Sequence, residues 1–157
     1  MNLEEKIVKK LQQLNYTITT AESCTGGLLA GRILNVSGAS SVYNEGHITY
    51  SNESKERLLG VKHETLEEYG AVSSQTAKEM AEGALKAANA NVGLSTTGIA
   101  GPGGGSKEKP VGLIYVACCI DGETYVKECR FSGTREGNRN NAVEAVLELL
   151  DERLFCI

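Results

Sequence analysis

The 157-residue sequence contains no apolar run approaching the ~20 residues of a membrane-spanning helix, and its first residues, Met1 to Lys6, lack the apolar segment of a secretory signal. It also has no excess of positive charge, because 16 Lys and Arg stand against 20 Asp and Glu and the net charge is -4. Proteins that bind nucleic acid or membrane surfaces gain affinity from clustered Lys and Arg, so we expect neither partner. These absences predict a cytoplasmic protein.

The cysteines and histidines lack the spacing of a metal site or a disulfide framework. The five cysteines include no Cys-x-x-Cys pair, and their odd number suits a reducing compartment. Cys118 and Cys119 are adjacent in a strand-like run, so we expect their side chains on opposite faces. His47 and His63 form no ligand motif with neighbouring Cys, Glu or His residues. We therefore expect neither a metal nor a cofactor.

Polar residues are concentrated where a predicted strand becomes a predicted helix. Residues 16–20 alternate in β-favouring types, whereas apolar residues recur at helical spacing over 28–34. Between them, Ser23 or Thr25 can cap the helix. Gly26 and Gly27 allow a ligand to approach the first-turn amides, and such a helix start attracts an anion or a developing oxyanion. Ser23 is therefore either a simple N-cap or a nucleophile.

A second junction of this kind follows. We predict a strand over about 41–50 and a helix that begins at Ser51 or Asn52. Tyr50 ends the strand and Lys55 lies one turn into the helix, so both could share a sheet edge with Ser23, where open α/β sheets place their ligands. The alternative is that Lys55 is a solvated helix charge paired with a neighbouring Glu.

Five glycines occur in the nine residues 98–106, directly after a predicted strand over 92–97. Such a loop can wrap backbone amides around a phosphate or an oxyanion. It matches neither standard phosphate loop. Ser106 stands at the third glycine position of the Gly-x-Gly-x-x-Gly loop, and Gly105-Ser106-Lys107 reverses the Gly-Lys-Ser/Thr order of the P-loop. The alternative is a flexible surface connector.

The remaining pattern indicates an α/β fold in a single domain over 1–157. Helices are expected over 3–14, from the first junction to about Val36, and after a cap at Ser73 or Ser74. Alanines form a small-residue face on the last of these helices. The apolar run 110–120 predicts a strand buried on both faces, and Asp121-Gly122 turns it into an antiparallel strand over 123–131. A final helix opens with Arg135 and Arg139 one turn apart, which are either solvated or facing an anion.

Five blocks of residues carry a likeness to a known family: residues 20–27, 49–55, 70–73, 97–104 together with 109–112, and 131–135. In these blocks, and over nearly the whole chain, the sequence resembles the CinA C-terminal domain family. This is the competence/damage-inducible protein A module that also exists as a stand-alone nicotinamide-nucleotide amidase. One departure is Thr134, where the family usually has Asp before the arginine.

The resemblance implies a three-layer α/β/α fold with a mixed sheet of about five strands. It also implies hydrolysis of the carboxamide of nicotinamide mononucleotide to nicotinate mononucleotide and ammonia, in pyridine-nucleotide salvage, without a cofactor. By motif match, Ser23 would be the nucleophile, with Tyr50 and Lys55 assisting proton transfer. The substrate-binding residues would be Thr25, Gly26, Gly27, Thr97, Gly98, Gly101, Gly103, Gly104 and Arg135.

This chemistry is consistent with the residue types. Amide hydrolysis needs an activated hydroxyl, a base and donors for the oxyanion, and the chain offers Ser23 with Lys55 or Tyr50 and no plausible His/Asp pair. Two other interpretations remain open: a nucleotide-binding or competence-related regulatory module without turnover, and a thiol amidohydrolase with Cys24 as nucleophile. The glycine-rich loop and the small-residue helix suggest surfaces for a homo-oligomer.

Overall fold

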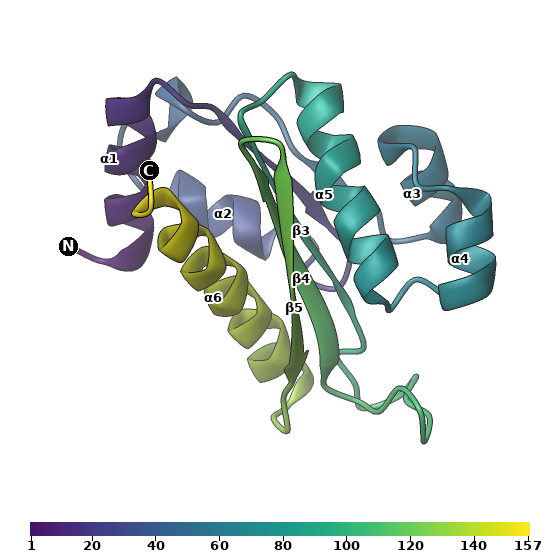
Figure 1. Ribbon diagram of the computed structural model, residues 1–157. Helices are drawn as coiled ribbons and strands as arrows, with labels where there is room; N and C mark the ends of the chain where they lie inside the picture. The colour runs from purple at the N-terminus through teal and green to yellow at the C-terminus, as the bar shows by residue number, and fades with distance from the viewer.

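The computed structural model describes residues 1–157 as a five-stranded sheet with helices on both faces (Figure 1). The strands are β1 (Ile18–Glu22), β2 (His47–Ile48), β3 (Val92–Gly98), β4 (Leu113–Ile120) and β5 (Glu123–Arg130). The helices are α1 (Leu3–Leu14), α2 (Leu28–Leu34), α3 (Asn52–Leu59), α4 (His63–Tyr69), α5 (Ser74–Ala88) and α6 (Arg135–Leu154), with a 3₁₀ turn over Ala39–Ser41. Helices α1, α2 and α6 cover one face and α3, α4 and α5 the other, which confirms the three-layer α/β/α arrangement.

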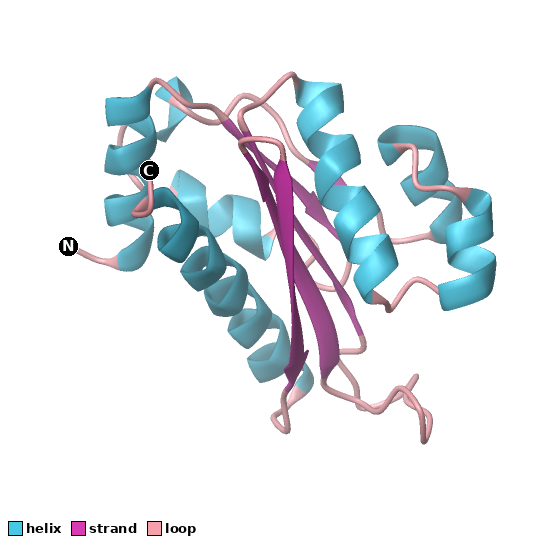
Figure 2. Cartoon of the chain, in the orientation of Figure 1, coloured by secondary structure: helices cyan, strands magenta, loops and turns pink.

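The sheet is mixed, as predicted. Its strand order is β2-β1-β3-β4-β5, with β1 parallel to both β2 and β3, and with β4 antiparallel to β3 and β5. The strands form the layer between the two sets of helices (Figure 2). Asp121 and Gly122, with φ of 52° and 80°, form the hairpin between β4 and β5 because both accept the left-handed backbone of that turn. The parallel pair β1 and β3 thus ends at one edge of the sheet, beside the loops that follow.

The central strands are buried on both faces, and their hydroxyl side chains bind the neighbouring helix layer. Ser95 Oγ donates to the Ala77 carbonyl at 2.6 Å, and Thr97 Oγ1 donates to the Ala71 carbonyl at 2.7 Å. Helix α5 lies close to β3, since a Cβ at Gly93 would stand 2.4 Å from the Ala81 oxygen. The small-residue face of α5 therefore packs against the sheet inside the chain.

One prediction of secondary structure was wrong, and one helix was missed. The strand expected over about 41–50 is reduced to His47–Ile48, preceded by the 3₁₀ turn and a single bridge from Tyr43 to Ile18. In this segment the Tyr43 hydroxyl contacts Thr20 Oγ1 at 2.8 Å and leaves no space for a Cβ at Gly46. Helix α4 was not predicted at all. None of the helices has the length and apolar character that crossing a bilayer requires.

Candidate active site

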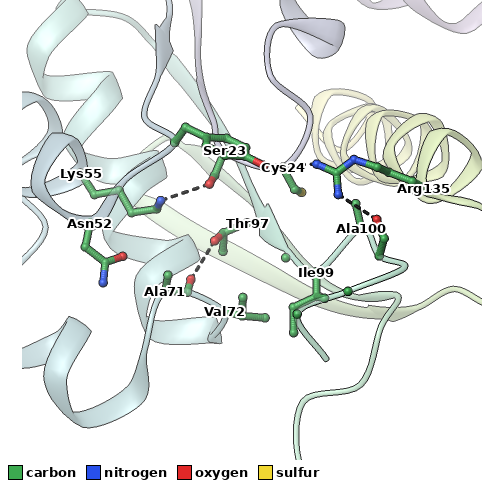
Figure 3. Close-up of a pocket in the computed structure, with 15 residues that line it drawn as sticks. Ser23, Cys24, Asn52, Lys55, Ala71, Val72, Thr97, Ile99, Ala100 and Arg135 are labelled. Carbon is green, nitrogen blue, oxygen red and sulfur yellow. Dashed lines mark hydrogen bonds between the residues drawn. The ribbon is translucent and has the colours of Figure 1, made fainter. Parts of the chain in front are cut away.

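A cavity of about 300 Å³ lies beyond the ends of β1 and β3. Side chains from both helix layers and from the glycine-rich loop surround it (Figure 3). Because parallel neighbours end at the same sheet edge, this is where an α/β sheet of this kind accepts a ligand. The cavity is lined by nine of the predicted site residues, namely Ser23, Tyr50, Lys55, Thr97, Gly98, Gly101, Gly103, Gly104 and Arg135.

Lys55 and Ser23 meet inside this cavity. Lys55 Nζ donates to Ser23 Oγ at 3.1 Å (Figure 3). It also donates to the Thr49 carbonyl at 2.8 Å. The side chain reaches inward from the first turn of α3, which Ser51 caps by accepting the N–H of Ser54. Lys55 is only 1% exposed and forms no ion pair, which rules out the alternative of a solvated helix charge.

Burial also changes the acidity of this lysine. Removing the ammonium group from water disfavours its charged form, and burial lowers the pKa of Lys55 from its ordinary value of 10.5 to about 8. A substantial fraction of the amine is therefore neutral just above physiological pH. A neutral amine accepts a proton, so the contact that Nζ donates to Ser23 can reverse, with the serine hydroxyl donating to Nζ.

The turn that carries Ser23 is held by a residue to which the sequence assigned no role. Both oxygens of the buried Glu22 carboxylate accept first-turn amides of α2, from Leu29 at 2.8 Å and Ala30 at 3.0 Å, and Thr25 Oγ1 donates to the same group at 2.6 Å. A carboxylate is a strong cap for a helix N-terminus. Neither Ser23 nor Thr25 caps α2, which starts after Gly27.

This cap explains why three of the predicted substrate-binding residues lie away from the cavity. Thr25, fully buried, is bound to Glu22 and Thr96, and Gly26 and Gly27 are absent from the cavity lining. The positive end of α2 is already neutralised by Glu22, so no ligand anion is required there. The one available signal in the sequence was a lone carboxylate at the end of an otherwise uncharged strand.

Cys24 lines the cavity but is poorly suited to nucleophilic attack. Its side chain is 6% exposed, and burial raises the pKa of its thiol to about 12. The thiolate is the reactive form of cysteine, and almost none is present at neutral pH. The local chemistry therefore favours Ser23 over Cys24 as the nucleophile.

The glycine-rich loop is anchored at both ends and presents free amides between them. Ile99 exchanges backbone hydrogen bonds with Gly112 and Leu113, and the buried Asn138 donates to the Ala100 carbonyl at 3.0 Å. The N–H groups of Ala100, Gly101, Gly103 and Gly104 donate to no acceptor within the chain. The loop is thus a fixed rim of amide donors. Asn138 was not anticipated, since buried asparagines in a helix leave no pattern in the sequence.

Arg135 and Tyr50 meet at the mouth of the cavity. Arg135 donates to the Gly101 carbonyl at 2.8 Å and to the Tyr50 hydroxyl at 3.2 Å, and Tyr50 is 66% exposed. Tyr50 forms no hydrogen bond with Ser23 or Lys55. Thr134 caps α6 by accepting the Gly137 N–H, a task that an aspartate performs equally well, so the departure at this position leaves Arg135 in place.

Arg139 lies one turn further along α6. It is partly buried and does not line the cavity. Its guanidinium donates to the carbonyls of Cys24 and Thr25, at 2.9 Å and 3.2 Å. No group of three or more His, Cys, Asp or Glu side chains lies together in a way that could hold a metal ion. The chemical groups that line the cavity include a hydroxyl, an amine, a thiol, a phenol, backbone amides and the guanidinium of Arg135.

Comparison with known proteins places this chain in a family. The family model of the CinA C-terminal domain matches residues 1–154. Relatives named competence-damage inducible protein include one from Clostridium botulinum (strain ATCC 19397 / Type A), 56% identical over 98% of this chain and 37% of its own length. Another, from Clostridium acetobutylicum, is 56% identical over 98% of this chain and 38% of its length. The chain thus spans little more than a third of these curated relatives.

Solved structures agree with the fold in detail. The competence/damage inducible protein CihA of Agrobacterium tumefaciens has a TM-score of 0.93 and 45% identity, over 96% of this chain and 92% of that one. A CinA superfamily protein of Klebsiella pneumoniae 700603 has a TM-score of 0.94 and 34% identity, over 99% and 97% of the two chains.

Proposed function

Because this chain belongs to the CinA C-terminal domain family, we propose that it is a serine amidohydrolase that converts nicotinamide mononucleotide to nicotinate mononucleotide and ammonia. The single observation that carries the proposal is the buried contact of 3.1 Å between Ser23 Oγ and Lys55 Nζ. A hydroxyl becomes a nucleophile when a neighbouring base accepts its proton, and a lysine with a pKa of about 8 is such a base.

The reaction follows from these two groups. Neutral Lys55 takes the Ser23 proton while Oγ bonds to the carboxamide carbon, and the carbonyl electron pair moves to the oxygen. The tetrahedral species collapses, the C–N bond breaks, and the Lys55 ammonium returns the proton to the departing nitrogen, which leaves as ammonia. Water then attacks the Ser23 ester, Lys55 receives its proton, and the serine hydroxyl is restored as the carboxylate leaves.

The rim of the cavity supplies the groups that a nucleotide needs. The free amides of Ala100, Gly101, Gly103 and Gly104 and the Arg135 guanidinium are donors for a phosphate, and charge-assisted hydrogen bonds of this kind are about twice as strong as neutral ones. Tyr50 contacts Arg135 at the mouth, so we assign it to the substrate rim and assign Lys55 as the base.

Two features support an enzyme over a regulatory module that only binds nucleotide. Burying a lysine that lacks a carboxylate partner is costly, and a simple binding site has no use for an amine aimed at a hydroxyl. The thiol alternative is disfavoured because burial raises the pKa of Cys24 to about 12.

The test is ammonia release from nicotinamide mononucleotide by the wild type, Ser23→Ala and Ser37→Ala. Ser23→Ala should lower kcat by several orders of magnitude, whereas the exposed Ser37 serves as a matched control and should leave it unchanged. Both melting temperatures should stay within a few degrees of the wild type. A wild type that releases no ammonia, or a Ser23→Ala variant with near-normal turnover, would refute the proposal.

A further inference from the structure

Arg139 links the last helix to the turn that follows Ser23. The two residues it contacts, Cys24 and Thr25, lie 115 and 114 positions away in the sequence. Its Nε and Nη2 atoms bind successive carbonyls, so the planar guanidinium fixes two peptide groups at once. Arg139 has no Asp or Glu within ion-pair distance, unlike Arg32, which bridges Glu4 and Glu144.

Gly26 shows that the turn is built around this contact. Gly26 has a φ of +54°, and a Cβ there would stand 3.2 Å from Arg139 Nη2. The backbone of the turn is closed by the Gly26 N–H donating to the Ser23 carbonyl at 3.1 Å, and by the Leu28 N–H donating to the Thr25 carbonyl at 3.0 Å. Glycine suits this position because the backbone is left-handed, and the guanidinium packs closely against it.

The backbone of the same turn sets the direction of an amide. In a trans peptide the C=O and N–H groups point in opposite directions, so the Ser23 carbonyl that accepts the Gly26 N–H turns the Cys24 N–H away from Gly26. The N–H groups of Cys24 and Thr25 donate to no acceptor in the chain. The Thr25 side chain cannot swing, because its hydroxyl is bound to Glu22 and Thr96 at 2.6 Å and 2.7 Å.

Resting on the function proposed above, we propose that Arg139 is a positioning residue: by binding the carbonyls of Cys24 and Thr25 it holds the turn after Ser23 so that the unpaired N–H of Cys24, which lines the cavity, receives the oxyanion. Backbone amides directly after a nucleophile are suited to this task, because the carbonyl oxygen of the substrate stands next to the attacked carbon.

The experiment uses the full chain as Arg139→Met, Arg139→Lys and the matched control Arg32→Met. Each is assayed for kcat and KM on nicotinamide mononucleotide and on its thiocarboxamide analogue, and each melting temperature is recorded. Sulfur is a weak hydrogen-bond acceptor, so the wild type should favour the oxygen substrate through its amide donors. Arg139→Lys keeps the charge and most of the packing, which covers the case in which Arg139→Met does not fold.

We expect Arg139→Met to lower kcat for the carboxamide about 10- to 100-fold with KM changed less than about threefold, and to reduce the preference for oxygen over sulfur by a similar factor. Arg139→Lys should be intermediate, since an ammonium cannot bind both carbonyls. Arg32→Met should change the melting temperature but neither kcat nor that preference.

A loss of kcat in the Arg139 variants with an unchanged preference for oxygen over sulfur would make Arg139 purely structural and overturn the inference. An unchanged kcat would overturn it as well. A wild type without amidase activity would instead refute the proposed function, and the inference with it.

Discussion

Replacing Lys55 by methionine should inactivate the protein and, at neutral pH, make it more stable. Lys55 is 1% exposed and has no carboxylate partner, so its charged form is held in the interior at a cost. Burial lowers its pKa from 10.5 to about 8. At about 1.4 kcal/mol per pKa unit, this difference corresponds to about 3 kcal/mol of destabilisation below pH 8.

Methionine removes that cost and keeps most of the packing volume, but it also removes two hydrogen bonds, to Ser23 Oγ and the Thr49 carbonyl. Each is worth about 1 kcal/mol, which leaves a net gain of about 1 kcal/mol or slightly more at pH 7. For a domain of this size, the melting temperature should rise by about 2 to 4 °C per kcal/mol.

The gain should depend on pH in a defined direction. Below pH 8 both the folded and the unfolded wild type carry the Lys55 proton, and the full cost of burial is present. Between about pH 8 and 10.5 the unfolded chain holds the proton but the folded chain does not, so the wild type becomes more stable as the pH rises. The advantage of Lys55→Met should therefore fade and then reverse over this window, because only the lost hydrogen bonds remain.

Thermal melts of the wild type and Lys55→Met at pH 7, 8, 9 and 10 test this reasoning. The control is Lys9→Met, because Lys9 is solvent-exposed on α1 and its replacement should produce no such pH-dependent difference. A Lys55→Met variant that melts below the wild type at pH 7, or a difference that stays constant from pH 8 to 10, would refute the burial cost on which the base role depends.

Lys55→Arg should be almost inactive, because arginine keeps the charge but cannot give up its proton; retention of more than about a tenth of wild-type kcat would exclude Lys55 as the base. In the wild type, kcat/KM should rise about tenfold from pH 7 to 9 and flatten above pH 8, and a flat stopped-assay profile would contradict this. Arg135→Ala should weaken the mononucleotide far more than the dephosphorylated riboside, by about 1.5 to 3 kcal/mol, and equal losses measured by titration calorimetry would assign Arg135 to structure instead. Cys24→Ala should retain turnover, and a thiol alkylator should inhibit this variant no more than it inhibits the wild type. Loss of ammonia release in Cys24→Ala would reopen the thiol mechanism.

The sequence predicted the fold class because its signals are local. Period-two and helical spacing of apolar residues, the Asp121-Gly122 turn and the apolar run over 110–120 depend only on neighbours in the chain, and they suffice for an α/β fold with a mixed sheet. The three-layer arrangement was implied by the resemblance to the family. The strand expected over about 41–50 was wrong because an edge position and the contact between Tyr43 and Thr20 decide its shape. Local propensity carries no information about such contacts.

For the candidate site, the sequence by itself identified Ser23, Lys55 and the glycine-rich loop as residue types at the ends of strands, and matching motifs supplied their family. Only the tertiary structure decided what surrounds them: that Lys55 is buried against Ser23, that Glu22 caps α2, and that Arg139 reaches the carbonyls of Cys24 and Thr25. Motif spacing places a residue on an element. The burial of Lys55, its pKa and the direction of the backbone amides beside Ser23 depend on contacts between residues that are 32 to 115 positions apart in the sequence.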